Sequence, residues 1–260
     1  IAGHVMHELG ADVVTIGVQP NGLNINLECG ATHCSTLQKA VLQHHADLGI
    51  ALDGDGDRIM MVDKQGRLYD GDQLLYIIAK HRKQRRLLRG GVVGTLMTNL
   101  AIENRFKKMN IPFLRAKVGD RHVLELLHEK KWYLGGENSG HIVCKDKHTT
   151  GDGIISALQV LYALRDTQKT LAQSMRGVSL YPQRLINVKI SKPFDFSTNE
   201  AIKTMQEAAE ADLNSKGRVL IRASGTEPLI RIMIEGESKH KVNHWAERIA
   251  EAMRIAANHS

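Results

Sequence analysis

"IALDGDGDRIMMVD", residues 50–63, places three aspartates and an arginine between two apolar runs. The flanking runs "LGIAL" and "IMMVD" have the length and composition of buried β-strands. Asp53, Asp55 and Asp57 alternate with two glycines in the loop between these runs. An acidic β-turn would explain one Asp-Gly pair, but it leaves three mutually repelling carboxylates beside an arginine unexplained. The stretch therefore predicts a strand–loop–strand unit whose loop binds a cation.

The spacing of the aspartates limits which cation the loop can hold. In an extended chain Asp53 and Asp57 would lie about 13 Å apart, but the two glycines let the backbone curl and the carboxylates converge. Oxygen ligands favour a hard ion, Mg2+ or Ca2+. An EF-hand loop would need glycine and glutamate where this chain has Arg58 and Lys64. Mg2+ usually binds few carboxylates together with a substrate phosphate, which Arg58 would also suit.

The charge balance indicates an acidic partner. The chain has 260 residues with 35 basic and 28 acidic side chains, a formal net charge of +7. This excess suits a small phosphorylated ligand or a nucleic acid. The densest basic run, residues 81–89 ("HRKQRRLLR"), has no aromatic side chain on which a base could stack. We interpret this run as a solvated helix end and expect no nucleic-acid partner.

Cysteines and apolar runs indicate the compartment. Cys29, Cys34 and Cys144 form an odd set without paired spacing, which predicts free thiols in a reducing environment. The longest apolar-leaning run, residues 153–164, is shorter than the roughly 18 residues that a membrane span needs. No signal peptide is recognisable. We expect a cytoplasmic protein without a membrane partner.

Alternating helix-like and strand-like patterns predict a mixed α/β fold. We expect two successive mixed α/β three-layer domains, residues 1–68 and 69–180, followed by a small α+β domain, residues 181–260. The alternation in residues 69–180 predicts parallel strands. The chain starts inside a helical pattern without an initiator methionine, so we expect a fragment whose N-terminal part is absent.

Some local patterns predict individual elements. Residues 11–17 ("ADVVTIG") predict a strand. Capping-box spacing occurs at Ser35 with Gln38 and at Ser197 with Glu200, each at the start of a predicted helix. The helix expected over residues 240–258 would bury one apolar face, formed by Val242, Trp245, Ile249, Met253 and Ala256.

The loop "GGENSGH", residues 135–141, has the side chains that a polyol needs. Glu137 can accept two hydroxyl hydrogen bonds, and Ser139 and His141 can donate or accept them. A serine-hydrolase elbow would require glycine in place of Glu137 and His141. A polar turn in which Glu137 caps a neighbouring helix explains the loop equally well.

The loop "RASGTEPLIR", which runs from Arg222 to Arg231, has the features of an anion site. Ser224 and Thr226 offer hydroxyl groups, and Gly225 lets backbone N–H groups turn inward. The two arginines carry planar donor forks suited to phosphate oxygens. A simple hairpin turn with exposed arginines is the alternative interpretation.

Two further turns precede predicted helices. In "TTGDGI", residues 149–154, Asp152 is expected to be an ordinary N-cap. In "KVGDRHV", residues 117–123, Gly119, Asp120 and Arg121 either cap the helix or contact a ligand.

These loops, in this order, resemble the α-D-phosphohexomutase superfamily. "DGDGDR" is similar to its metal loop, "GENSGH" to its sugar loop and "RASGTEP" to its phosphate loop. "PNGLNIN", "CGATH", "KVGDR" and "TTGDGI" favour the branch that acts on glucosamine phosphates. The resemblance runs nearly end to end and covers the second, third and fourth of the family's four domains.

The resemblance implies a role for each loop. Asp53, Asp55 and Asp57 would hold Mg2+, with Arg58 steadying the phosphoryl group and His141 transferring a proton or orienting a neighbour. The implied sugar-binding residues are Glu137, Asn138, Ser139 and His141. The implied phosphate-binding residues are Arg222, Ser224, Gly225, Thr226 and Arg231.

The implied reaction interconverts glucosamine 6-phosphate and glucosamine 1-phosphate, on the route to UDP-N-acetylglucosamine. Glucosamine 1,6-bisphosphate would be the intermediate and the primer, and a small phosphorylated amino sugar the partner. The family's donor phosphoserine belongs to its first domain, so we expect this chain alone to be inactive. The resemblance leaves open a homodimer of the full-length protein.

Two other enzyme classes remain as alternatives. A phosphomannomutase/phosphoglucomutase would use the same loops on other sugars. A haloacid-dehalogenase-like phosphatase would use Asp53 as nucleophile and Asp55 as acid and base, but its motif usually has threonine or valine where this chain has Asp57.

Overall fold

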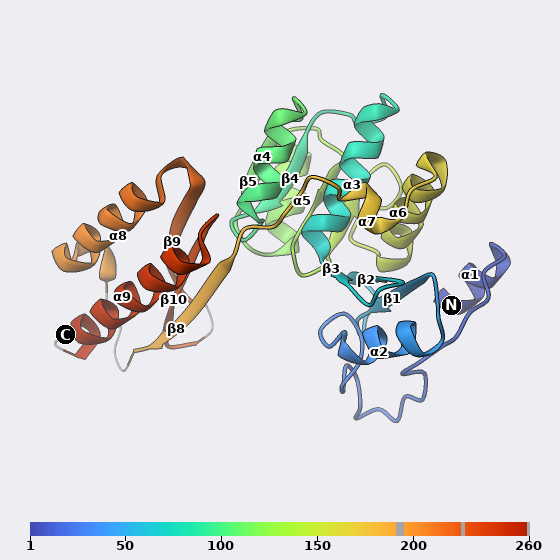
Figure 1. Ribbon diagram of the computed structural model, residues 1–260, viewed down its shortest axis with the longest axis horizontal. Coiled ribbons are helices and arrows are strands. Elements are labelled where there is room, and N and C mark those ends of the chain that lie inside the picture. The colour runs from blue at the N-terminus through green and yellow to red at the C-terminus, as the bar shows by residue number, and fades with distance from the viewer. Residues whose placement is uncertain (191–194, 225–226, 259–260) are drawn as a thin grey trace. The chain divides into compact units, whose positions relative to one another are not determined.

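The computed structural model describes residues 1–190, 195–224 and 227–258. The chain divides into two compact units, residues 1–98 with 102–178 and residues 99–101 with 179–260 (Figure 1). Both units combine helices with sheets, which confirms the mixed α/β class. The domain boundaries near residues 68 and 180 stay predictions. Within the described ranges, no helix is long and apolar enough to cross a lipid bilayer.

The first unit contains an antiparallel sheet that positions the acidic loop. Its strands β1 (Leu48–Leu52), β2 (Ile59–Asp63) and β3 (Leu68–Tyr69) are arranged in sequence order. Leu52 pairs with Ile59, so residues 53–58 close the hairpin, and the two strands predicted around the aspartates are confirmed. Helix α2 (Ser35–Gln43) packs on this sheet, and α1 (Ala2–Glu8) precedes it.

A second sheet in the same unit has the order β5-β4-β6-β7. Strands β4 (Val92–Thr95), β5 (Phe113–Ala116) and β6 (Leu134–Gly136) are parallel, as the alternation of helices and strands predicts. Strand β7 (Ile142–Cys144) runs antiparallel to β6. The turn between β6 and β7 contains residues 137–141 and therefore presents the predicted sugar loop.

Helices cover both faces of this second sheet. Helix α5 (Asp120–Glu129) packs through Val123 and Leu127 against Val93 and Val143. Strand residues alternate between faces, so the sheet has a second apolar face on the side away from α5. The helices α3 (Gly71–Gln84) and α4 (Leu100–Lys108) lie on that side. There Tyr76 of α3, Phe106 of α4 and Phe113 of β5 form a chain of ring contacts.

Helix α6 (Gly153–Thr167) joins the two sheets of the first unit, because it contacts β1, β2, β7 and α3. Its N-cap is Asp152, whose carboxylate accepts a hydrogen bond from the Ile155 N–H at 2.8 Å, as predicted. A short helix, α7 (Leu171–Ser174), follows it. The hairpins that contain the acidic loop and residues 137–141 are therefore held by one packed body.

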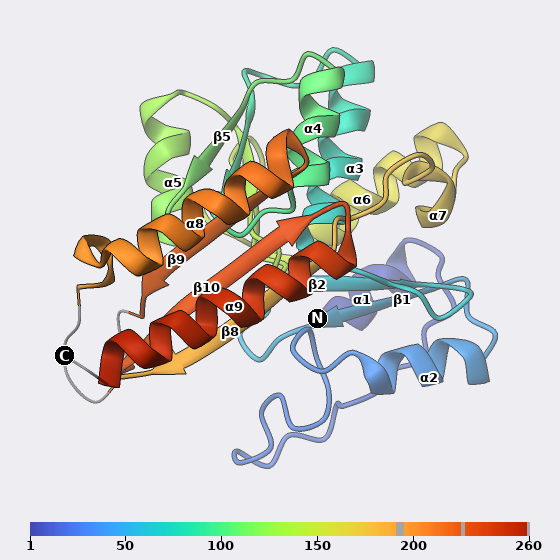
Figure 2. The same ribbon diagram turned by 60° about the vertical axis from the view of Figure 1, so that its left-hand side comes forward.

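The second unit is a three-stranded antiparallel sheet with two helices on one face (Figure 2). The strands β8 (Gln183–Lys189), β9 (Gly217–Ala223) and β10 (Leu229–Gly236) have the order β8-β10-β9. The helices α8 (Glu200–Leu213) and α9 (Lys239–Asn258) pack against Ile230, Ile232 and Ile234, which all face the same side. The 3₁₀ turns η1 (Phe196–Thr198) and η2 (Asn214–Lys216) flank α8. The predicted apolar face of α9 is confirmed: Val242, Trp245, Ile249 and Met253 are buried and Ala256 packs against them.

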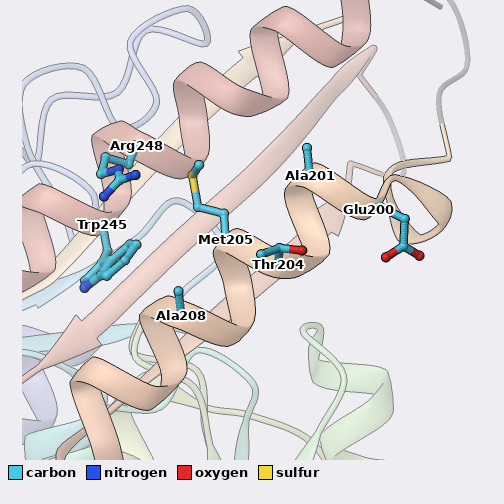
Figure 3. Close-up of a pocket in the computed structure, with 7 residues that line it drawn as sticks. All are labelled: Glu200, Ala201, Thr204, Met205, Ala208, Trp245 and Arg248. Atoms are coloured by element: carbon cyan, nitrogen blue, oxygen red, sulfur yellow. The ribbon is translucent and has the colours of Figure 1, made fainter.

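A pocket of about 430 Å³ lies along the seam between α8 and α9 (Figure 3). Met205 of α8 and Trp245 of α9 supply its apolar wall. The indole N–H of Trp245 donates to Asp212 at 2.8 Å, and the Arg248 guanidinium lies 5.3 Å from the indole ring centre. The indole N–H thus has its hydrogen-bond partner within the unit, and the side chains along the seam pack the two helices together.

Three local predictions are wrong. Residues 11–17 form no strand, and Val14 and Ile16 are exposed. No strand within the described residues pairs with this segment, and an unpaired strand would leave its backbone groups without partners. The Ser35–Gln38 capping box is absent because Cys34 is the N-cap of α2, and the Gln38 amide donates to the Gly66 carbonyl instead.

The predicted Ser197–Glu200 capping box is also wrong. Ser197 lies in η1, where its hydroxyl donates to Asp195 at 2.6 Å. The N-cap of α8 is Asn199, whose side-chain oxygen accepts the Ile202 N–H at 3.2 Å. The extra 3₁₀ turn shifts the start of the helix by two residues relative to the pattern.

The two candidate caps of α8 can be tested directly. We expect Asn199→Ala to lower the free energy of unfolding by about 1 kcal/mol, the usual value of an N-cap. Ser197→Ala should cost clearly less, because its hydroxyl bonds outside α8. Urea unfolding of both variants measures the difference. A larger loss for Ser197→Ala would restore the capping box inferred from the sequence.

Candidate active site

The three aspartates converge at the tip of the β1–β2 hairpin. One carboxylate oxygen from each of Asp53, Asp55 and Asp57 lies within 4.8 Å of the other two. Gly56 has a φ of +75°, a left-handed conformation that favours glycine and lets the loop curl. The Asp53 carboxylate accepts the backbone N–H of Arg58 at 3.1 Å. The geometry gives one cluster of oxygen ligands, the arrangement that a hard divalent ion needs.

Arg58 compensates part of the negative charge in this loop. Its Nε lies 3.5 Å from Asp53 and 3.7 Å from Asp57. The Arg58 side chain is still 44% exposed, so its outer nitrogens can meet an incoming anion. Asp57 Oδ1 is buried and has no hydrogen-bond partner within the described residues. A buried carboxylate oxygen without a hydrogen bond, in a loop where three aspartates converge, fits a site for a cation.

His141 connects the acidic loop to the sugar loop. Its Nδ1 lies 3.0 Å from Asp57 Oδ2, and its side chain is only 4% exposed. Arg58 and His141 also form an isolated antiparallel bridge, and the Ile59 N–H donates to the Gly140 carbonyl at 3.0 Å. The acidic hairpin and the β6–β7 hairpin therefore lie side by side, joined by backbone and side-chain hydrogen bonds.

The turn before α6 closes around this junction. The Gly153 N–H donates to the Gly56 carbonyl at 2.8 Å. A Cβ atom at Gly151 would lie 2.2 Å from His141 Nε2, so no larger residue fits unless the imidazole moves. His141 Nε2 is buried without a hydrogen-bond partner among the described residues. Gly151 and Gly153 thus hold the imidazole and the acidic loop in place.

Glu137 belongs to the loop of residues 135–141 and also forms a hydrogen bond with the neighbouring turn. Its Oε1 accepts the backbone N–H of Gly119, the N-cap residue of α5, at 2.9 Å. The helix-cap alternative therefore accounts for one of its two carboxylate oxygens. Asp120 lies in the first turn of α5, and Arg121, with its side chain 83% exposed, pairs with Glu125 at 2.8 Å. The structure thus brings Gly119 next to the sugar loop through Glu137.

The rest of the sugar loop is a tight turn. Asn138 and Ser139 are half-buried, and the Asn138 carbonyl accepts the Gly71 N–H at 3.2 Å. Gly140 has a φ of +99°, and a Cβ there would lie 2.3 Å from the Ile59 carbonyl oxygen. The backbone position is fixed by the acidic hairpin, while the side chains of Asn138 and Ser139 make no hydrogen bond that the structure records.

The predicted phosphate residues lie in the second unit. Arg222 of β9 and Arg231 of β10 are direct cross-strand neighbours, on the sheet face opposite α8 and α9 by strand alternation. Burial and the nearby charge of Arg231 lower the pKa of the Arg222 guanidinium. Arg231 pairs with Glu227 at 3.0 Å, and its Nε is buried without a partner among the described residues.

The loop between these two strands is only partly described. The Ser224 N–H donates to the Leu229 carbonyl at 2.9 Å, and its hydroxyl oxygen accepts the Glu227 N–H at 3.3 Å. Gly225 and Thr226 lie outside the described residues. Two like charges opposite each other destabilise a strand pair, so an anion between Arg222 and Arg231 would relieve this repulsion.

Comparison with known families agrees with the order of these loops. A model described as phosphoglucomutase/phosphomannomutase, alpha/beta/alpha domain II, matches residues 1–66. Models of alpha/beta/alpha domain III and of the C-terminal domain match residues 70–181 and 185–252. The chain belongs to the phosphoglucomutase/phosphomannomutase family.

Members of this family share high identity with the chain. A protein of Nitrosospira multiformis named phosphoglucosamine mutase is 68% identical over 257 residues, which are 99% of this chain and 56% of that protein. A protein of the same name from Methylobacillus flagellatus is 60% identical over 99% of this chain and 57% of its own length. The chain therefore spans a little over half the length of these relatives.

Solved structures of the phosphoglucomutase/phosphomannomutase family share the fold. A family protein from Burkholderia thailandensis has a TM-score of 0.79 at 21% identity, covering 98% of this chain and 58% of that one. The Aspergillus fumigatus N-acetylphosphoglucosamine mutase, solved in complex with GlcNAc-6P and magnesium, has a TM-score of 0.73 at 23% identity. The match to the Aspergillus protein covers 89% of this chain and 54% of that one.

For this family member, sequence reasoning missed the two glycines that flank Asp152. The residue pattern of the turn "TTGDGI" predicts only that Asp152 caps a helix, whereas Gly151 also borders His141 and the Gly153 N–H donates to the Gly56 carbonyl. An N-cap needs no glycine on either side. The pair of glycines was the available signal that another backbone approaches closely.

The cation site can be tested with Asp55→Asn. We expect weaker Mg2+ binding, because the change removes one charge from the ligand cluster, and a slightly more stable ion-free protein, because repulsion falls. Titration calorimetry measures the affinity and urea unfolding the stability. Asp47→Asn, at an exposed position, is the matched control. Equal Mg2+ affinity in both variants would show that the cluster is not the site.

The role of Gly151 can be tested with Gly151→Ala. The added methyl group must displace the His141 imidazole, so we expect a loss of about 1–3 kcal/mol in unfolding free energy, as for other overpacked sites. Mg2+ affinity should fall too, because Asp57 loses its 3.0 Å contact. Gly3→Ala is the control, since an added Cβ there meets nothing closer than 3.4 Å. A Gly151→Ala variant with wild-type stability would contradict the packing.

Proposed function

We propose that this chain supplies the metal, sugar and phosphate sites of a mutase that interconverts glucosamine 6-phosphate and glucosamine 1-phosphate. The observation that carries the proposal is the 3.0 Å contact between Asp57 and His141, which joins the acidic loop to the polar loop. The 68% identity to a protein named phosphoglucosamine mutase supports the choice of sugar. Because the chain spans 56% of that relative, the proposal concerns the activity of the longer protein.

The acidic loop would hold Mg2+ through Asp53, Asp55 and Asp57. When bound, this ion would neutralise charge on the oxygens of a transferring phosphoryl group. Arg58 is anchored between Asp53 and Asp57, and its exposed end would contact the same phosphoryl group. The Aspergillus relative, which was solved with magnesium and GlcNAc-6P, supports this pairing of ion and phosphosugar.

The surroundings of His141 support orientation over proton transfer. If a neutral His141 donates its Nδ1–H to Asp57, its other ring nitrogen carries no proton, and that nitrogen is buried against Gly151. A substrate hydroxyl could reach it only if the turn before α6 moved. His141 would therefore fix the carboxylate of Asp57, the role that outer-shell partners play around metal ligands.

The loop of residues 135–141 would bind sugar hydroxyls. Glu137 uses one oxygen for the Gly119 N–H, which leaves the other to accept from a hydroxyl. Ser139 and Asn138 offer further donors and acceptors from a turn whose backbone is fixed by Ile59 and Gly71. A rigid turn with adaptable polar side chains would suit a bisphosphorylated intermediate that must present either end to the metal loop.

Arg222 and Arg231 would hold the phosphate that is not reacting, together with Ser224, Gly225 and Thr226. The two arginines are direct cross-strand partners on β9 and β10. An anion between them would replace like-charge repulsion by two charge-assisted contacts. This physical gain supports the phosphate assignment.

A sister activity on mannose or glucose phosphates is the second candidate, because the matching family models carry the names phosphoglucomutase and phosphomannomutase. The amino group of glucosamine is what separates the substrates. Titrating the chain with glucosamine 6-phosphate, mannose 6-phosphate and glucose 6-phosphate under one condition tests the choice. We expect glucosamine 6-phosphate to bind most tightly.

The phosphate site can be tested with Arg222→Ala. We expect glucosamine 6-phosphate binding to weaken by about 1.5–3 kcal/mol, the range for hydrogen bonds to charged groups. Glucosamine binding should not change, because it has no phosphate. Arg184→Ala is the control, because it removes an arginine of β8, in the same sheet, that pairs with Glu247 of α9. Equal losses for both ligands would mean that Arg222→Ala acts through folding.

The reaction itself can be tested with a hybrid that joins the unmatched part of the Nitrosospira relative to this chain. We expect the hybrid to interconvert the two glucosamine phosphates with Mg2+ and glucosamine 1,6-bisphosphate, and the 260-residue chain alone to be inactive. The physical reason is that the family's nucleophilic serine divides one transfer into two easier steps. A coupled assay measures both proteins. Turnover by the chain alone would place the nucleophile within it.

A further inference from the structure

The basic run at the end of α3 lines a cavity that none of the three predicted loops shares. The cavity has a volume of about 320 Å³ and lies between the end of α3, the segment after β7 and helix α6. Its charged and polar lining comes from His81, Arg82, Arg86, Arg89, Asp146, Lys147, Gln159 and Tyr162. Residues 81–89, which the sequence predicts to be a solvated helix end, therefore line part of this cavity.

Positive charge exceeds negative charge in this lining. Four cationic side chains meet a single carboxylate, Asp146. Asp146 is already engaged, since Arg82 contacts it at 2.9 Å and Lys147 lies 3.7 Å away. Neither Arg86 nor Arg89 contacts a carboxylate among the residues that the structure describes. The cavity therefore keeps uncompensated positive charge.

The wall of the cavity is preorganised. The Arg82 side chain is 7% exposed, and its two terminal nitrogens donate to Asp146 and Gln159, both at 2.9 Å. The Arg89 guanidinium lies 5.6 Å from the centre of the Tyr133 ring. His81 is fixed by Asp166 at 2.8 Å. A ligand would thus meet side chains that already have defined positions, which lowers the entropic cost of binding.

The helix dipole alone does not account for this cluster. Basic residues in the last turn of a helix interact favourably with its C-terminal carbonyls, and Arg82 and Lys83 are placed to do so. Arg89, however, lies beyond the end of α3, and Lys147 belongs to a segment some sixty residues later in the chain. Convergence of cations from two segments on one hollow is the arrangement of an anion-binding site.

We propose that this cavity binds a small molecule that carries a diphosphate group. Arg86 and Arg89 would contact the phosphate oxygens, because neither pairs with a described carboxylate and arginine forks match phosphate geometry. Lys147, which shares Asp146 with Arg82, would add a third positive charge. Two linked phosphates carry several negative charges, which would balance these three cations. A diphosphate with a small substituent fits the volume of the cavity. Tyr162, 52% exposed at the cavity wall, offers a ring for a planar substituent.

The test uses inorganic pyrophosphate as the probe on the 260-residue chain, in an Arg222→Ala background that weakens the other proposed phosphate site. We expect saturable binding by calorimetry and slower amide hydrogen exchange in residues 81–89 and 145–147. Arg86→Gln with Arg89→Gln should weaken pyrophosphate binding at least tenfold. Lys107→Gln with Lys108→Gln removes the same charge from exposed positions of α4 and should change the affinity less than twofold.

The outcomes separate the proposal from bulk electrostatics. Equal weakening by the two double variants, or protection outside residues 81–89 and 145–147, would overturn the proposal. Unfolding midpoints of both double variants should match the parent, because the changed side chains are exposed. ADP is the second probe. If ADP binds more tightly than pyrophosphate and Tyr162→Leu removes that difference, the ligand is a nucleotide. If ADP and pyrophosphate bind equally, the ligand is a diphosphate without a base.

Discussion

The hydrogen bond between His141 and Asp57 is the contact on which the candidate active site depends. It joins the tip of an antiparallel hairpin to the turn of a mainly parallel sheet, and the two elements are 84 residues apart. Carboxylates that converge repel each other, so the acidic loop needs a fixed neighbour to keep its shape. His141, Arg58 and the Gly56 carbonyl bond supply that constraint from three directions. The packing of α6 against both sheets makes the junction rigid.

The second unit places two like charges next to each other on one face of its sheet. Its helices bury one face of a three-stranded sheet, and its other face presents two arginines as direct neighbours. Such a pair costs stability in the absence of an anion. Nearby Glu227 neutralises only part of the charge. A strand pair that is less stable without a ligand is consistent with a binding surface, because the ligand then restores what the sheet alone lacks.

Much of the fold could be predicted because its helices have regular apolar periods and its strands are short apolar runs between polar loops. The hairpin around the acidic loop and the apolar face of α9 follow from the spacing of apolar residues, and the parallel strands follow from the alternation of strands with helices. The errors have one cause: a strand or a cap depends on neighbours as well as on local composition. Residues 11–17 have the composition of a strand but no described partner strand. Ser35 and Ser197 have capping-box spacing, but each helix starts at another residue.

The sequence by itself determined which chemical groups are available: three carboxylates around glycines, a polar turn, and arginines flanking a Ser-Gly-Thr loop. These groups limit the ligands that we expect, because carboxylates bind cations and guanidinium groups bind anions. Only the tertiary structure decided which groups meet. The contact of His141 with Asp57 joins residues 84 positions apart. The fit of Gly151 against the imidazole and the pairing of Arg222 with Arg231 depend on how each loop folds back. Such contacts depend on strand register and helix packing, which no local pattern encodes.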